Sequence, residues 1–167
     1  MPKDYKAATQ WFHKAAEQGY APAQGLLGFM YTTGQGVPKD YTVAIEWFQK
    51  AAQQGDAPAQ NNLGAVYDGG LGVPKDYKLA TQWFRKAAEQ GYASAQYNLG
   101  IMYETGRGVS KSDATAVYWY LEASTHGDEG AKKRLEALRL SKRWDGKKPL
   151  TKQVDLPLNA CTPCFQR

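Results

Sequence analysis

An internal repeat of 36 residues constrains the fold of this 167-residue chain more than any other feature. The repeat is marked by tryptophans at Trp11, Trp47, Trp83 and Trp119. Glycine, alanine and leucine positions recur in the same register, and residues 21–56 and 57–92 share 22 identities in 36 positions without a gap. A fixed period of this length is typical of a solenoid, in which each unit buries its apolar face against its neighbours.

Within one period the sequence predicts two helices joined by a glycine-rich loop. In residues 57–92, the first helix has Pro58 in its opening turn, where the missing N–H is tolerated, and it ends near Gly70, because glycine adopts positive φ readily. Asp76 is the predicted N-cap of the second helix, and Gly91 ends that helix. The second helix has an apolar stripe with a period of 3.6 residues, formed by Leu79, Ala80, Trp83, Phe84, Ala87 and Ala88.

Three motifs recur in register along residues 1–142 and are clearest in residues 57–92. They are Leu63-Gly64-x-x-Tyr67, Gly70-x-Gly72-Val73-x-x-Asp76 and Ala80-x-x-Trp83-Phe84-x-Lys86-Ala87-Ala88-x-x-Gly91. With these motifs the chain resembles the Sel1-like repeat family, a relative of the tetratricopeptide repeats with a longer connection. Tetratricopeptide repeats themselves have a period of about 34 residues and lack the Gly-x-Gly-Val loop. The resemblance implies a right-handed α/α superhelix and a role as an adaptor or protein-binding scaffold, often in bacteria.

We therefore predict an all-α fold, a right-handed α/α superhelix (solenoid) of about eight antiparallel helices with an irregular C-terminal tail. The predicted solenoid covers residues 1–143. It consists of a half repeat at 1–20, full repeats at 21–56, 57–92 and 93–128, and a capping helix at 128–143. Residues 144–167 have no repeat match and contain three prolines, so we expect an extended or disordered tail.

The N-terminal unit is only half present in the sequence. Residues 1–20 match residues 73–92 at 17 of 20 positions, so the chain begins at the start of a second helix. Two explanations stay open: a truncated or mis-started reading frame, or an end that another chain covers. As written, no apolar segment follows Met1, so we expect a cytoplasmic protein. If the true start lies upstream of Met1, a signal peptide could be missing and the protein would be periplasmic or secreted.

The net charge of +5 lies in the C-terminal region. Residues 1–127 carry 11 basic and 11 acidic side chains, whereas residues 128–167 carry 10 and 5. Neutral repeats argue against a nucleic-acid partner, and the lack of an apolar run of about 18 residues argues against a membrane span. The predicted capping helix is basic at Lys132, Lys133, Arg134, Arg139, Lys142 and Arg143. These side chains form either a solvated face near the negative end of the helix dipole or an anion-binding patch.

No residue pattern indicates catalysis, a cofactor or a metal site. Cys161 and Cys164 have the spacing of a redox pair or half a zinc site, but they lie close to the C-terminus, with no predicted strand and no nearby histidine. A local disulfide, inert thiols and an intermolecular link all remain open. Cysteine-rich members of the family have been described as binding or hydrolysing β-lactams, with a cysteine pair inside each repeat that this chain lacks. A cell-wall or β-lactam-interacting enzyme is therefore the alternative function.

The leading hypothesis is a non-enzymatic scaffold that binds a protein or peptide on its concave face. By similarity to tetratricopeptide repeats, positions i, i+4 and i+7 of each first helix line that face, and these positions vary between repeats. They are Gly25, Phe29 and Thr32, then Asn61, Ala65 and Asp68, then Tyr97, Ile101 and Glu104.

Among these residues, we expect Phe29 and Tyr97 to be the anchors, because aromatic residues dominate binding hot spots. The apolar centre and acidic edge of the set suit a partner with some basic character. Simple tolerance of variation at solvent positions is the alternative explanation. The half repeat or the C-terminal tail could also mediate a homodimer.

Overall fold

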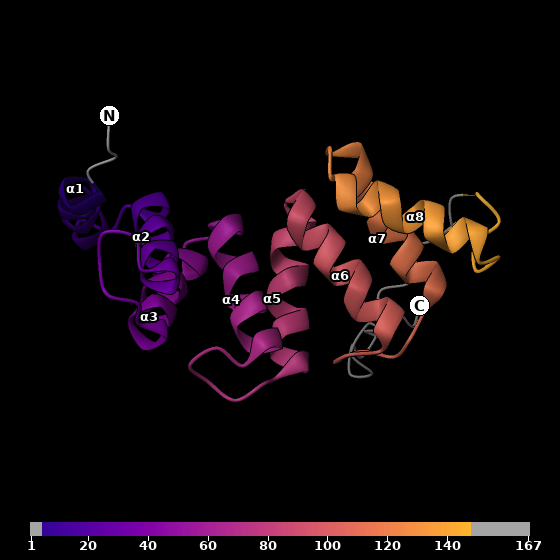
Figure 1. Cartoon of the computed structure of the whole chain (residues 1–167), viewed down its shortest axis with the longest axis horizontal. Helices are drawn as coiled ribbons and strands as arrows, with labels where there is room; N and C mark the ends of the chain where they lie inside the picture. The colour runs from indigo at the N-terminus through magenta and orange to yellow at the C-terminus, as the bar shows by residue number, and fades with distance from the viewer. Residues whose placement is uncertain (1–4, 148–167) are drawn as a thin grey trace, which may run out of the picture.

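The computed structural model describes residues 5–147, with side chains from residue 9 onward, and this part of the chain is all-helical. It forms eight helices: α1 (Tyr5–Glu17), α2 (Ala21–Thr33), α3 (Tyr41–Gln53), α4 (Ala57–Gly69), α5 (Tyr77–Glu89), α6 (Ala93–Thr105), α7 (Asp113–Thr125) and α8 (Glu129–Leu140). Figure 1 shows them following one another along the long axis, from α1 at one end to α8 at the other. Each helix packs against the next, and α2 also contacts α4. The prediction of an all-α solenoid is confirmed.

Short polar side chains start the helices where the sequence indicates. The predicted N-cap Asp76 accepts a hydrogen bond from the Leu79 N–H at 2.9 Å. Asp40 and Ser112 cap the equivalent helices α3 and α7, and Asp56 caps α4 by accepting from the Ala59 N–H at 2.7 Å. Each such bond satisfies one of the backbone donors that a helix leaves unpaired in its first turn.

Glycines in the first helices let the second helices approach closely. Gly64 of α4 lies directly against the ring of Phe84 in α5, and a Cβ atom built on Gly64 would lie 2.5 Å from Phe84 Cδ1. The same arrangement joins Gly28 to Phe48 and Gly100 to Tyr120. The Leu-Gly pair of each repeat is therefore a packing device, with a buried leucine beside a glycine that receives an aromatic ring.

The Gly-x-Gly-Val loop brings successive repeats together. Gly108, in the loop between α6 and α7, has φ of +70°, and a Cβ atom there would collide with the backbone carbonyl of Tyr77 at the start of α5. Glycine is needed at this position for both the backbone conformation and the close approach.

A buried glutamine near the start of each first helix links three consecutive helices. In α4, Gln60 Nε2 donates to the Ala52 carbonyl at 3.1 Å, while Gln60 Oε1 accepts from Gln90 Nε2 at 2.8 Å. The pattern repeats at Gln24 with Ala16 and Gln54, and at Gln96 with Ala88 and His126. These bonds satisfy buried polar atoms while joining the second helix of one repeat to both helices of the next.

The two ends of the described solenoid differ. At the α1 end, Trp11 is 70% exposed, whereas its equivalent Trp119 near the other end is 4% exposed. At the α8 end, Ala131, Leu135 and Leu138 are buried in the core shared with α7, and most outward positions of α8 are polar, although Leu140 is 75% exposed. Helix α8 thus covers apolar residues of the last full repeat.

Candidate functional site

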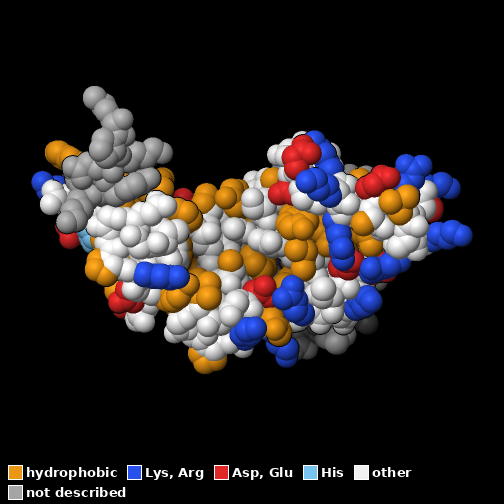
Figure 2. Space-filling view, viewed as in Figure 1, with side chains coloured by type: hydrophobic (Ala, Val, Ile, Leu, Met, Phe, Trp, Pro, Cys, Tyr) orange, Lys and Arg blue, Asp and Glu red, His pale blue; other side chains and the backbone are white. Residues whose placement is uncertain are grey.

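A stripe of uncharged side chains runs over the outer surface of the first helices. In α2, α4 and α6, the residues at four equivalent positions are exposed or half-buried, and none of them is ionisable. We call this set the uncharged stripe: Pro22, Leu26, Phe29, Thr33, Pro58, Asn62, Ala65, Gly69, Ser94, Asn98, Ile101 and Thr105. Figure 2 shows apolar side chains at several places along the middle of the molecule and basic side chains gathered around α8.

The middle residues of the sequence-predicted face belong to this stripe. Phe29 is 45% exposed, Ala65 is exposed and Ile101 is half-buried. Phe29 and Leu26 are both large apolar side chains with nearly half their surface open to solvent. This column of the predicted face is accessible to a partner.

The predicted residues on one flank of that column contact neighbouring helices of the solenoid. A Cβ atom on Gly25 would lie 3.2 Å from the Asp56 carboxylate, at the start of α4. Asn61 accepts a hydrogen bond from Asn98 Nδ2 of α6 at 2.9 Å. Tyr97 packs on Tyr120, with ring centroids 5.7 Å apart. Each of these three residues thus contacts a residue of another helix or of its N-cap.

The predicted residues on the other flank are engaged within the solenoid as well. The Thr32 hydroxyl donates to the Phe29 carbonyl at 2.7 Å. Asp68 forms an ion pair with Arg107 at 2.9 Å, and Glu104 is buried. The acidic edge expected from the sequence is therefore neutralised inside the chain, and the surface that remains open is uncharged.

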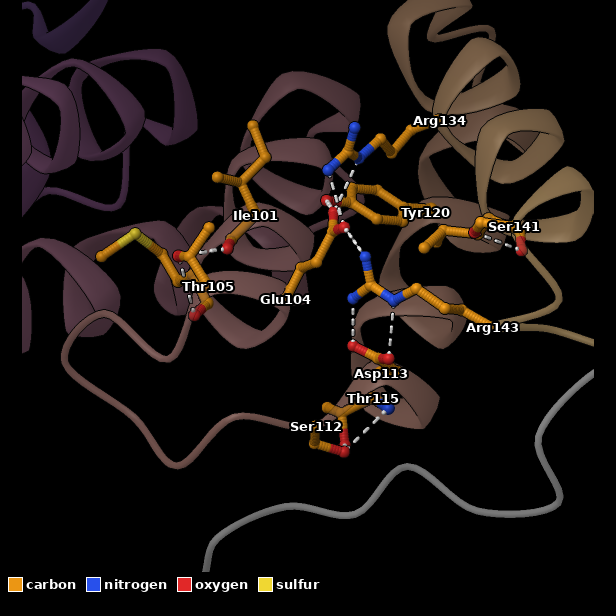
Figure 3. A network of polar contacts seen from close by, with 12 residues as sticks. Ile101, Glu104, Thr105, Ser112, Asp113, Thr115, Tyr120, Arg134, Ser141 and Arg143 are labelled. Atoms are coloured by element: carbon orange, nitrogen blue, oxygen red, sulfur yellow. Dashed lines mark hydrogen bonds and ion pairs between the residues drawn. The ribbon is translucent and has the colours of Figure 1, made fainter.

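Glu104 is the centre of a polar network that holds the last helix, which we call the Glu104 cluster (Glu104, Asp113, Tyr120, Arg134 and Arg143; Figure 3). Arg134 of α8 donates from Nε and Nη2 to the two Glu104 carboxylate oxygens at 2.7 and 2.6 Å. Arg143 adds a third bond at 2.9 Å, and the Tyr120 hydroxyl donates at 2.8 Å. Arg143 also binds Asp113 at the start of α7.

The cluster keeps its charges despite burial. Burial alone would raise the pKa of Glu104, but hydrogen bonds from Arg134 and Tyr120 and the charges of Arg134 and Arg143 outweigh it, so the pKa lies below 4.5. Burial and the contact with Glu104 raise the pKa of Tyr120, which stays a neutral donor. The hydrogen bond from Arg143 lowers the pKa of Asp113. Glu104 is thus an ionised carboxylate with 4% of its side chain exposed.

Sequence reasoning missed this cluster, although one signal pointed to it. The last full repeat has Tyr120 where the others have Phe48 and Phe84, and it has Glu104 where the others have Thr32 and Asp68. A hydroxyl gained at position 120, facing a longer carboxylate at position 104, indicates a shared hydrogen bond. Arg134 and Arg143 are accordingly engaged by Glu104 and Asp113, so only part of the basic surface of α8 and the residues after it remains for a partner.

The described part of the chain contains no group of three or more metal-ligating side chains. Within the same residues, no helix is long and apolar enough to cross a membrane. Cys161 and Cys164 lie outside the described residues.

The chain matches the Sel1 repeat model at residues 1–20, 21–56, 57–92 and 93–128. A comparison with curated proteins gave no match. Among solved structures, it is similar to a protective antigen with an SLR fold from uropathogenic Escherichia coli strains, with 42% identity and a TM-score of 0.80. It is also similar to a Sel1 repeat protein from Oxalobacter formigenes, with 40% identity and a TM-score of 0.79.

Each of these two matches covers 84% of this chain, which spans 30% and 58% of the respective relatives. Cysteine rich protein B of Helicobacter pylori is similar at 26% identity, with a TM-score of 0.63 over 80% of this chain and 96% of that one. The repeat match and the structural likeness agree with the packing of glycine, aromatic and glutamine positions described above, and the chain belongs to the Sel1 repeat family.

Proposed function

We propose that the protein is a non-enzymatic scaffold that binds a protein or peptide segment along the uncharged stripe of α2, α4 and α6. Sel1 repeats commonly act as protein-interaction scaffolds and are generally non-catalytic. The observation that carries the proposal is the stripe itself, which crosses the first helices of three consecutive repeats without an ionisable side chain and exposes Leu26 and Phe29. Exposed apolar surface of this kind marks interaction sites more often than it serves stability.

The neutralised edge of the stripe refines the chemistry of the expected partner. Because Asp68 and Glu104 are paired with arginines, the surface offers no uncompensated negative charge to a basic ligand. Asn62 and Asn98 add amide donors and acceptors beside the apolar residues. We therefore expect a partner segment with apolar anchors and few charges, bound as an extended chain or an amphipathic helix.

Peptides selected on the wild-type protein by phage display test this proposal. Replacing Phe29 or Ile101 by asparagine should weaken the selected peptides about tenfold or more, because loss of an apolar anchor typically removes more than about 1 kcal/mol of binding free energy. Titration calorimetry with the synthetic peptides provides the measurement. Gln53→Asn, at an exposed position of α3, is the control and should leave affinity unchanged. Equal loss in the control, or none at Phe29 and Ile101, would place the binding face elsewhere.

A second proposal concerns self-association at the α1 end. Trp11, Tyr20, Leu26 and Phe29 are the most exposed large apolar residues of that end, and a second copy could cover them. We expect a monomer–dimer equilibrium in sedimentation velocity at concentrations of about 10–100 μM that Trp11→Arg shifts to monomer. A wild-type protein that stays monomeric over this range, or a variant that dimerises equally, would contradict it.

A further inference from the structure

A groove lies along the outer face of α5, on a different part of the molecule from the uncharged stripe. It has a volume of about 880 Å³ and lies between α5 and the loop of residues 106–110. The α5 side of this groove, which we call the α5 groove, is formed by Lys78, Thr81, Gln82, Arg85, Lys86 and Glu89. Figure 1 shows the first turn of α5 and the α6–α7 loop at the same edge of the molecule.

The α5 groove is the most basic of the equivalent surfaces of the second helices. It has three cations and one carboxylate. At the same six positions α1 has Lys6, Lys14 and Glu17, α3 has only Glu46 and Lys50, and α7 has only Glu122. Because α3 and α7 form without a basic residue at the positions of Lys78 and Arg85, the second helix does not require these charges, although α1 has Lys6 and His13 there. None of the ion pairs formed by residues 9–147 includes Lys78, Arg85 or Lys86.

Two of the three cations, Lys86 and Arg85, contact aromatic side chains of the solenoid. Lys86 Nζ lies 4.4 Å from the centroid of the Trp83 ring, and Lys50 takes the same place over Trp47 at 4.2 Å. Lys86 thus belongs to a lysine–tryptophan contact that the repeats share. Lys78 and Arg85 stand at the positions of Thr42 and Gln49 of α3, and Arg85 Nη2 donates to the neutral Tyr103 hydroxyl at 2.6 Å.

From this charge pattern and the shape of the cavity, we propose that the α5 groove binds an extended acidic segment of a partner protein, with carboxylates placed against Lys78 and Arg85. These two residues are seven positions apart on the helix, which corresponds to a rise of about 10 Å. In an extended peptide that distance separates residues about three positions apart. Residues 1–127 carry 11 basic and 11 acidic side chains, and this neutral balance disfavours a polyanionic nucleic acid, so a protein segment fits better.

Fluorescein-labelled Gly/Ser peptides with two glutamates at varied spacing provide the probe, together with glutamine twins of the same length. Fluorescence anisotropy should show the tightest binding when the glutamates are about three positions apart, and binding should weaken as salt rises. A single-stranded oligothymidylate of similar charge is the competitor. Glutamate peptides that bind no better than their glutamine twins would overturn the proposal, and so would preferential binding of the oligothymidylate.

The variant Lys78→Thr with Arg85→Gln takes the residues that α3 already has at these positions, so the helix should keep its fold. We expect it to bind the best glutamate peptide about tenfold more weakly, with an unchanged far-UV spectrum. Lys133→Gln with Arg139→Gln removes the same net charge from exposed positions of α8 and should change affinity less than about twofold. An equal loss in both double variants would attribute binding to the overall charge of the protein and reject the groove. If the double variant changes the far-UV spectrum, the single variant Lys78→Thr replaces it as the test. It should bind the glutamate peptide about threefold more weakly, and unchanged affinity would contradict the proposal.

Discussion

Replacing Gly64 by alanine should destabilise the protein by about 2 kcal/mol, even though alanine is the better helix former. Intrinsic propensity favours alanine by about 1 kcal/mol inside a helix. The new Cβ atom, however, would lie 2.5–3.0 Å from three atoms of the Phe84 ring. Phe84 is 3% exposed and packed on all sides, so the ring cannot turn away, and α4 and α5 must separate. Overpacking of this kind outweighs the gain in propensity.

Gly69→Ala is the matched control for this substitution in the same helix. A Cβ atom there would lie 3.2 Å from Leu71 Cγ, and Leu71 is 38% exposed and free to move. We expect this variant to be neutral or slightly more stable than the wild type. Urea unfolding followed by circular dichroism measures both variants. Equal stabilities for Gly64→Ala and Gly69→Ala would show that the close contact in α4 does not limit packing.

A second substitution tests whether contact with the Phe84 ring causes the loss of stability in Gly64→Ala. Phe84→Leu shortens the side chain that fills the Gly64 position and should cost about 1–2 kcal/mol alone. Combined with Gly64→Ala, the total loss should be smaller than the sum by at least about 1 kcal/mol, because the two groups are in contact. Simple additivity would instead mean that alanine at position 64 acts through other neighbours.

The glycine and N-cap positions illustrate what the repeat made predictable. Asp76, Gly64 and Gly70 recur because each performs the same local task in every unit, so a single sequence with several units contains enough information to assign them. The apolar core followed for the same reason, and Ala80, Phe84, Ala87 and Ala88 are buried as predicted. Leu79 and Trp83 of the same stripe are half-buried.

The predicted binding face could not be derived fully from the repeat pattern. Periodicity identifies positions that vary, but it does not distinguish a residue that varies in solvent from one that varies with its neighbour. Phe29 lies on the open surface, whereas Tyr97 and Glu104 face partners about 20 to 30 residues away in sequence, Tyr120 and Arg134. Those partners belong to the last repeat and to α8, which depart from the consensus, so the repeat pattern did not reveal them.

The Glu104 cluster supports the second large prediction, which concerns the attachment of α8. Glu104→Gln should destabilise the protein by about 2–3 kcal/mol, because it removes a buried charge that accepts three hydrogen bonds from arginine. Arg134→Gln should cost about 2 kcal/mol, since Arg143 and Tyr120 still face the carboxylate. The double variant should lose at least about 1 kcal/mol less than the sum. Glu136→Gln, at an exposed position of α8, is the control and should change stability by less than about 0.5 kcal/mol.

Amide hydrogen exchange tests whether the Glu104 cluster holds α8 against the rest of the solenoid. Because α8 packs mainly on α7, loss of the bonds from Glu104 should raise amide hydrogen exchange in α8 more than in α2 to α5. A uniform rise along the chain would mean that Glu104 stabilises the solenoid as a whole. No rise in α8 would show that its apolar contacts suffice.

The pH dependence of stability isolates the charge of Glu104 from its shape. Its pKa in the folded protein lies below 4.5, so the folded state favours the ionised carboxylate. The stability that comes from this charge is complete above about pH 5 and is lost as the pH falls through the folded-state pKa. The wild type should therefore lose stability between about pH 5 and pH 3 more steeply than Glu104→Gln, and the gap between the two should narrow. Asp113, whose pKa is also lowered, is present in both proteins, so the difference between the two curves reports Glu104 together with its coupling to Asp113 through Arg143. A gap that stays constant from pH 7 to pH 3 would mean that the glutamine variant is destabilised by altered hydrogen-bond geometry, with no contribution from the charge.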